Sequence, residues 1–203
     1  MLGFYNYTVI LTYIGMLVGF AGVTHAMRGD VHTALLCLMV SGVCDMFDGA
    51  IASTMERTKQ EKRFGVQIDS LSDLVCFGVL PAVIVCASEG AGTAVRFLAG
   101  LYLLCALIRL AWFNVDEEER QDQESGSRTV YYGLPVTTAA LLLPAMMELG
   151  GRRGHALAPP LLLVMAAAFL TPFKLRKPHL TGKAVMLLCG VAELALLLTR
   201  SPV

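Results

Sequence analysis

The sequence predicts an all-α protein of the membrane, a polytopic bundle of six core transmembrane helices with a seventh helix at the C-terminal end. Hydrophobic residues make up 56% of the 203 residues and charged residues only 16%, whereas a soluble domain carries about 25% charged residues. The mean hydropathy is +0.64. Apolar runs of close to the ~20 residues needed to cross a bilayer recur along the chain. We expect one integral membrane domain over residues 1–203.

The first three helices are expected over residues 3–27, 31–55 and 65–88. The turn Arg28–Asp30 separates the first two, and the charged segment Glu56–Arg63 joins the second to the third. Pro81 is expected to kink the third helix, which membrane helices tolerate. The N-terminus lacks the basic region of a signal peptide, so we predict that the first helix is retained.

The remaining helices are expected over residues 92–115, 129–149, 158–173 and, as the seventh, 184–199. The acidic and polar segment 116–128 follows the fourth helix and is predicted to be mobile, and a basic link precedes the seventh helix. The six cysteines lie in apolar runs at irregular spacing, which is typical of small core residues and not of a disulfide or zinc framework. The net charge is zero, so nothing indicates a nucleic-acid partner.

Four aspartates form two pairs around the charged segment. Asp45 and Asp48 are three residues apart near the end of the second helix, and Asp69 and Asp73 are four apart near the start of the third. Residues at these spacings share a helix face, so each pair presents two carboxylates to one side. Such residues can cap helices or form a solvated rim. Carboxylates that converge at a bilayer edge without a cation are costly, and hard oxygen ligands suit Mg²⁺, Mn²⁺ or Ca²⁺, so we favour a metal or substrate site.

Small residues continue both aspartate stripes. Gly49 and Ala52 extend the first, and Gly65 precedes the second. Together they give Asp-x-x-Asp-Gly-x-x-Ala followed by Gly-x-x-x-Asp-x-x-x-Asp, a pattern of seven fixed positions. This pattern resembles the signature of the CDP-alcohol phosphatidyltransferase family, with the signature lying over residues 45–73. The resemblance implies a reaction in which a cytidine diphosphate lipid gives its phosphatidyl group to an alcohol and CMP leaves.

One position departs from the family pattern. The family usually has arginine directly after the alanine, and this chain has Ser53. Arg57 lies one helical turn beyond Ser53 on the same face, so we predict that it supplies the missing cation.

The stretches FGVQIDSLSDLVCFGVLPA, ALIRLAWFN and YYGLPV resemble the phosphatidylserine synthase branch of the family, although Trp112 stands where that branch more usually has arginine. Within them, Arg109 is an intramembrane cation that we expect to bind substrate, the alternative being an ion pair with an aspartate. Asn114 is expected either to bond a substrate or to cap the helix.

The resemblance implies separate roles for these residues in metal binding, proton transfer and substrate binding. Two divalent ions, Mg²⁺ or Mn²⁺, are held by Asp45, Asp48 and Asp69, with Asp73 shared. Asp73 is the general base that takes the proton of the serine hydroxyl. The residues expected to bind the nucleotide or substrate are Gly49, Ala52, Ser53, Arg57, Gly65, Arg109 and Asn114. The expected partners are CDP-diacylglycerol, L-serine, the lipid bilayer and a second copy of the chain in a homodimer.

Loop charges predict the orientation. The loops on the carboxylate side hold ten Lys or Arg and those on the other side five. The positive-inside rule then places the site at the cytoplasmic face of the plasma (inner) membrane.

Two alternative functions stay open. One is the same chemistry with glycerol phosphate or inositol phosphate as acceptor, or with an archaeal CDP-lipid. The other is a divalent-metal transporter, which we disfavour because it predicts acidic residues near the midplane or in both halves of a repeat.

Overall fold

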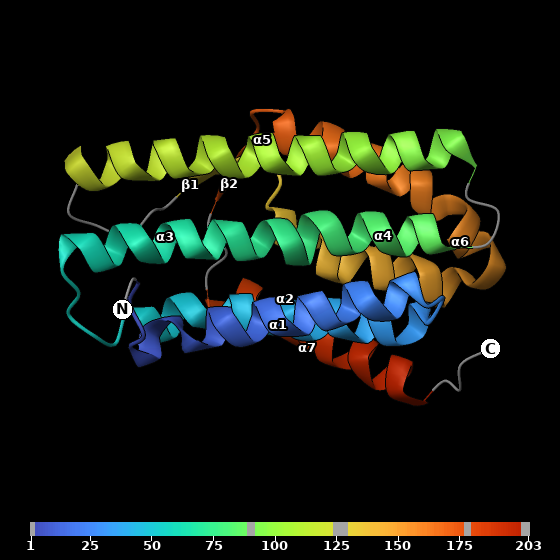
Figure 1. Cartoon of the computed structure of the whole chain (residues 1–203), viewed down its shortest axis with the longest axis horizontal. Helices are drawn as coiled ribbons and strands as arrows, with labels where there is room; N and C mark the ends of the chain where they lie inside the picture. Colours follow the sequence, from blue (N-terminus) through green and yellow to red (C-terminus); the bar gives the residue numbers. More distant parts are fainter. Residues whose placement is uncertain (1–2, 89–91, 124–129, 177–179, 200–203) are drawn as a thin grey trace.

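The structure is a computed structural model that describes residues 3–88, 92–123, 130–176 and 180–199. Its helices run roughly along one common axis in an elongated bundle (Figure 1). The α-helices are α1 Tyr7–Met27, α2 Val31–Ala52, α3 Lys59–Asp73, α4 Leu80–Ala87, α5 Thr93–Gln123, α6 Ala139–Leu170 and α7 Leu180–Thr199. The π-helical segment η1 covers Leu74–Val79, the 3₁₀ segment η2 covers Val136–Thr138, and the strands are β1 Val130–Tyr132 and β2 Lys174–Arg176.

Helices α1 and α2 form a closely packed antiparallel pair. The chain reverses at Gly29, whose φ is +81°, and Asp30 caps α2 by accepting a hydrogen bond from the Thr33 amide at 3.1 Å. That bond lowers the pKa of the Asp30 carboxyl. Gly19 and Gly22 lie on the face of α1 that meets Cys76 and Cys37, where an added Cβ would come within 2.5 and 2.8 Å of their side chains. The absence of side chains at these glycines therefore sets the close approach of the helices.

Helix α3 begins at Lys59, six residues before the predicted start at Gly65. Thr58 accepts a hydrogen bond from the Glu61 amide, and the Glu61 carboxylate accepts one from the Thr58 amide at 2.8 Å. This capping box satisfies amides that a helix start leaves free. The charged segment is thus the first turns of α3, and Asp69 and Asp73 lie deeper in the helix than the sequence predicted.

The predicted kink at Pro81 takes the form of a π-helical segment. Helix α3 continues through η1 into α4, which carries Pro81 in its first turn. In α-helical register, the partner of the Phe77 carbonyl is the amide of residue 81, which proline lacks. Tyr102 of α5 instead donates its hydroxyl to that carbonyl at 2.6 Å. Tyr102 is completely buried and joins α5 to the segment that follows Asp73.

Helix α5 extends to Gln123, well beyond the predicted end at Val115. The acidic stretch stays helical because Glu117 pairs with Arg120 at 2.6 Å and Glu118 pairs with Arg63 of α3 at 3.3 Å. The prediction of a mobile segment over residues 116–128 is therefore wrong up to residue 123. Residues 124–129 lie outside the described part of the chain.

Helix α6 joins the predicted fifth and sixth helices across a kink at Gly151, whose φ is +51°. The predicted fifth helix starts at Val136 and not at residue 129, because residues 130–132 form β1. Strand β1 pairs antiparallel with β2 and thereby holds the segment before η2 beside the segment before α7. Gly133 has a φ of +73°, and a Cβ there would lie 3.0 Å from the Phe169 carbonyl oxygen, so this turn requires glycine.

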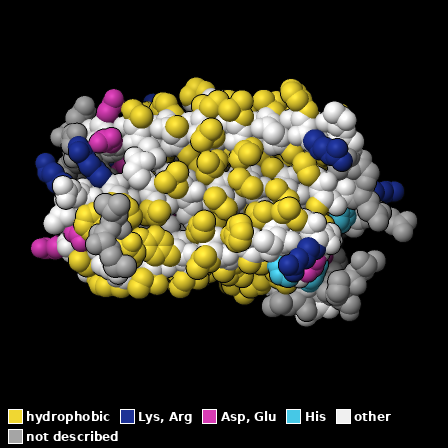
Figure 2. Space-filling model, in the orientation of Figure 1, with side chains coloured by type: hydrophobic (Ala, Val, Ile, Leu, Met, Phe, Trp, Pro, Cys, Tyr) yellow, Lys and Arg dark blue, Asp and Glu magenta, His cyan; other side chains and the backbone are white. Residues whose placement is uncertain are grey.

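The all-α membrane bundle is confirmed. Among the described residues, five helices are long and apolar enough to cross a membrane, and two shorter apolar helices cover Val136–Glu148 and Leu188–Leu197. Figure 2 shows hydrophobic side chains over the middle of the molecule and most charged side chains at its two ends. The chain is therefore an integral membrane protein. Three of the loop Lys and Arg residues that were counted to predict the orientation lie outside the described residues, namely Arg128, Lys177 and Arg200.

Replacing Tyr102 with phenylalanine should destabilise the bundle. The Phe77 carbonyl would lose its donor in an apolar setting, so we expect the free energy of unfolding to fall by about 1 kcal/mol. Thermal unfolding in detergent should report this as a lower Tm, by roughly 2–4 °C for a chain of this size. Tyr132→Phe, at an exposed tyrosine, serves as the control. Equal Tm values for the two variants would contradict this role for Tyr102.

Candidate functional site

The four aspartates meet between α2 and α3. One carboxylate oxygen each from Asp45, Asp48 and Asp69 lies within 4.8 Å of the others. The carboxyl groups of Asp45 and Asp73 are within hydrogen-bonding reach of each other, as are those of Asp48 and Asp69. The two pairs that lie far apart in the sequence thus form one cluster at one end of the bundle.

Helix α1 forms the third side of this cluster. Thr12 donates its hydroxyl to Asp48 Oδ2 at 3.1 Å. Ser72 donates to the Thr12 carbonyl at 3.4 Å, and Ser41 donates to the Gly15 carbonyl at 3.0 Å. These bonds fix the relative positions of α1, α2 and α3 at the level of the carboxylates. Thr12 was not predicted as a site residue, because a single threonine in an apolar helix carries no motif.

The cluster fits divalent cations. Oxygen atoms bound to one ion at about 2.0–2.6 Å can be at most about 4–5 Å apart, and the observed spacing of 4.8 Å or less meets that limit. Four carboxylates packed together in an apolar bundle repel one another unless cations compensate them. Asp45, Asp48 and Asp69 are therefore able to hold a metal ion, with Asp73 adjacent.

A polar cavity of about 200 Å³ opens on one side of the cluster, between α1, α2 and α3. Asp48 and Asp69 form its inner end, and Arg57 and Lys62 contribute two cations. The small residues Gly49, Ala52 and Gly65 also line it, as the sequence analysis expected for a nucleotide site. No atom stands within 4 Å of a Cβ placed at Gly49, so the cavity is open there.

Arg57 points into this polar cavity. Its Nη1 atom lies 3.1 Å from the position that a Cβ of Gly65 would occupy. Its Nε atom is buried and has no hydrogen-bond partner among the described residues. Ser53, in contrast, does not line the cavity. Its hydroxyl donates to the Ala50 carbonyl at 2.6 Å on an exposed surface. Arg57, and not Ser53, is thus placed to meet an anionic ligand.

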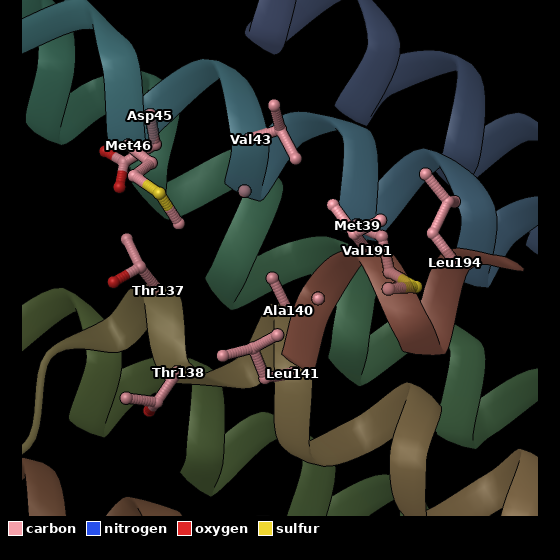
Figure 3. Close-up of a pocket in the computed structure, with 12 residues that line it drawn as sticks. Met39, Val43, Asp45, Met46, Thr137, Thr138, Ala140, Leu141, Val191 and Leu194 are labelled. Atoms are coloured by element: carbon pink, nitrogen blue, oxygen red, sulfur yellow. The ribbon is translucent and has the colours of Figure 1, made fainter. Parts of the chain in front are cut away.

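An apolar groove of about 150 Å³ opens on the other side of the cluster, between α2, the start of α6 and α7. Asp45 is its link to the carboxylates. Figure 3 shows Asp45 and Thr137 at one end of the groove and Leu194 of α7 at the other. Its middle is formed by apolar side chains such as Val43 and Leu141. The carboxylates therefore lie between a polar cavity and an apolar groove.

Arg109 and Asn114 lie apart from these spaces. Arg109 is only 6% exposed, and its guanidinium lies 5.6 Å from the Trp112 ring centroid and 5.7 Å from that of Phe113. It lines neither the polar cavity, nor the groove, nor the small space around Asp73. Asn114 lies inside α5 and is not a helix cap, so that alternative is wrong. Ser70 donates to its Oδ1 at 2.6 Å, which ties α5 to α3.

A second polar group lies at the opposite end of the bundle. His32 Nδ1, near the start of α2, is 3.6 Å from Glu148 Oε1 of α6. Glu193 of α7 is close enough to Glu148 for their charges to interact. The site carboxylates were predicted at one face only, and these two glutamates were not predicted as site residues. They lie outside the spaces that surround the aspartates.

A model of the CDP-alcohol phosphatidyltransferase family matches residues 5–172. A CDP-diacylglycerol–serine O-phosphatidyltransferase of Mycobacterium leprae is 29% identical over 140 residues, covering 68% of this chain and 45% of the relative. A Saccharomyces cerevisiae protein of the same name is 35% identical over 143 residues, covering 64% of this chain and 51% of that relative. An archaetidylserine synthase of Methanothermobacter thermautotrophicus is 27% identical over 142 residues, covering 70% and 57%. The chain thus spans about half the length of these relatives.

Proposed function

Because the chain belongs to the CDP-alcohol phosphatidyltransferase family, we propose that it transfers a phosphatidyl group from CDP-diacylglycerol to the hydroxyl of L-serine, giving phosphatidylserine and CMP. The observation that carries the proposal is the position of the carboxylates between a polar, cationic cavity and an apolar groove. Serine is favoured as acceptor because relatives from a bacterium and a yeast are named CDP-diacylglycerol–serine O-phosphatidyltransferase.

The two spaces match the two halves of a nucleotide-activated lipid. The polar cavity offers Arg57 and Lys62 to the diphosphate and has room for cytidine beside Gly49, Ala52 and Gly65. The groove offers apolar walls to a hydrocarbon tail. The phosphorus that joins the two halves then lies at the carboxylates. This places the reacting atom beside the residues that we assign to the chemistry.

Asp45, Asp48 and Asp69 would hold the metal ions, with Asp73 adjacent to them. Mg²⁺ or Mn²⁺ held there would supply the positive charge that a diphosphate and a leaving phosphate require. Thr12 orients Asp48 through its hydrogen bond. Without such ions, a diphosphate cannot lie against four carboxylates.

Asp73 is assigned as the general base. A serine hydroxyl is a weak nucleophile at neutral pH and needs a base within hydrogen-bond reach. Asp73 lines the small space between α1, α2 and η1 together with Ser41 and Ser72. It takes the hydroxyl proton as the serine oxygen bonds to the phosphorus of the phosphatidyl group. The bond from that phosphorus to the CMP oxygen breaks, and CMP leaves with the electron pair.

Orientation and assembly complete the proposal. The site faces the cytoplasm, from which serine arrives, while the lipid tails enter from the side between helices. The protein acts as a homodimer, and residues 1–203 form one catalytic domain.

An archaeal ether-lipid donor is the second candidate, favoured by the similarity to an archaetidylserine synthase. Asn114 acts in this scheme by holding α5 against α3, and Arg109 packs on Trp112 of its own helix and does not touch the reacting atoms.

The direct test is release of CMP by the purified protein. With CDP-diacylglycerol and Mn²⁺ or Mg²⁺, we expect turnover with L-serine and little with glycerol phosphate or inositol phosphate. Chelation of the metal should abolish turnover. A parallel reaction with an archaeal CDP-lipid distinguishes the two donors. Turnover with another alcohol but not with serine would overturn the acceptor assignment, and absence of CMP with every alcohol would overturn the enzyme assignment.

Asp73→Asn and Asp48→Asn should separate the base from the metal ligands. We expect Asp73→Asn to lower kcat at least about 10²-fold, the usual scale for loss of a general base, while it still binds Mn²⁺. Asp48→Asn should lose both turnover and tight Mn²⁺ binding. Calorimetric titration with Mn²⁺ measures the binding, and Glu56→Gln, outside the cluster, is the control. Loss of Mn²⁺ binding in Asp73→Asn would show that this residue is principally a ligand.

Arg57→Ala should weaken nucleotide binding. A hydrogen bond to a charged group is worth about 1.5–3 kcal/mol, so the affinity for CDP-diacylglycerol or CMP should fall roughly ten- to a hundredfold. The variant should keep its Mn²⁺ affinity, because Arg57 is not a metal ligand. Lys59→Ala is the matched control, since Lys59 is an exposed cation in the same segment that does not line the cavity. Unchanged CMP affinity in Arg57→Ala would show that Arg57 does not bind the nucleotide.

A further inference from the structure

Helix α7 completes the wall of the apolar groove. Gly190, Val191 and Leu194 of α7 face Met39 and Val43 of α2 and Leu141 of α6 across it (Figure 3). The match to the family model ends at residue 172, before α7 begins at Leu180. One wall of a space that reaches Asp45 is therefore built by a segment outside the matched region.

The lining of the groove identifies its occupant as a hydrocarbon tail. Its polar groups are Asp45, Thr137 and Thr138, which lie toward one end. Among the described lining residues there is no Lys or Arg that could bind the carboxylate of an amino acid. Val43 is 40% and Val191 55% exposed on the surface that faces the bilayer, so the groove is open to lipid from the side. A tail can enter there while its phosphate lies at the carboxylates.

We propose that α7 determines which hydrocarbon tails the protein accepts, with Gly190, Val191 and Leu194 forming the outer wall around one tail of the CDP-activated lipid. This inference rests on the proposed phosphatidyl transfer. It assigns α7 a role in donor selection and none in the chemistry, because its groove-lining residues carry no titratable group.

Gly190 is the position at which the groove can be closed. A Cβ at Gly190 would lie 3.5 Å from Leu141 Cδ2 across the groove, an ordinary contact distance. The first carbon of a larger side chain therefore fits without strain, and its remaining atoms would occupy the space of the tail. Leu194, which also lines the groove, offers the opposite change because truncation widens it. Ala192, in the same helix, is exposed and does not line the groove.

The test compares the unmodified protein with three variants on dipalmitoyl and dioctanoyl CDP-diacylglycerol. We expect Gly190→Leu to lower kcat/KM for the dipalmitoyl donor about tenfold relative to the dioctanoyl donor, the scale of steric discrimination in an apolar pocket. Leu194→Ala should shift the ratio in the opposite direction, and Ala192→Leu should leave it unchanged. The KM for the acceptor should not change. A ratio equal to that of the unmodified protein in both Gly190→Leu and Leu194→Ala would overturn the role of α7.

A binding measurement keeps this inference separate from the proposed reaction. A CDP-diacylglycerol analogue with a diazirine in its acyl chain should label residues 188–197 of α7 on irradiation, with or without an acceptor. Unlabelled CDP-diacylglycerol should suppress the labelling, and dioleoyl phosphatidylcholine should not. Equal suppression by phosphatidylcholine would identify the occupant as a bulk lipid and refute donor selection. Labelling with the expected competition but without CMP release would contradict the proposed reaction and would still support a binding site for the tail beside α7.

Discussion

The mutual repulsion of four carboxylates is the constraint on which the active end of the bundle depends. Asp45, Asp48, Asp69 and Asp73 come from two helices and meet in a space that also includes a wall of α1. Bringing them together requires helices that approach closely, and glycines on α1 allow this approach. The Thr12 hydroxyl bonds an oxygen of Asp48, and the hydroxyls of Ser41 and Ser72 donate to carbonyls of α1 and so hold the helices together at this level. Repulsion between charges at this distance in an apolar medium is large, so the arrangement favours the binding of cations.

The length of the apolar runs was sufficient to predict a membrane-spanning helix bundle, but the joining of the predicted fifth and sixth helices in α6 was not predicted, and the ends of the helices followed local polar interactions. Thr58 and Glu61 extend α3 backward through a reciprocal cap, which the sequence displays as Thr-x-x-Glu. The extension of α5 to Gln123 depends on the contact between Arg63 and Glu118, residues 55 positions apart (118 − 63), and no local pattern reveals such a contact. Likewise, proline marked a disturbance at residue 81, but only the structure shows a π-helical segment and the Tyr102 hydroxyl that meets the Phe77 carbonyl.

The candidate site was predictable where spacing on one helix carried the information. The aspartate pairs and the small residues Gly49, Ala52 and Gly65 follow from stripes three or four residues apart, and all of them line the cluster or its polar cavity. Arg57 was predicted from a helical spacing that the structure does not show, because α2 ends at Ala52 and Arg57 reaches the cavity from the link before α3. The intramembrane charge of Arg109 was a weaker basis for predicting a substrate-binding residue, because this side chain packs on Trp112 and Phe113 and does not line the cavity. The groove required tertiary structure, because its walls come from α2, α6 and α7.

The short first half of α6 links the site to the thickness of the membrane. Together with η2 it forms the apolar stretch Val136–Glu148, a rise of about 20 Å at ~1.5 Å per residue, whereas the hydrocarbon core of a bilayer is about 30 Å thick. A helix this short obliges the surrounding lipids to compress or the helix ends to sink below the headgroups. The same helix forms one side of the groove, so compression draws headgroups toward its mouth. Membranes of different thickness would therefore hold a lipid in the groove at different depths, so the host bilayer as well as the residues of the protein would set how that lipid meets the carboxylates.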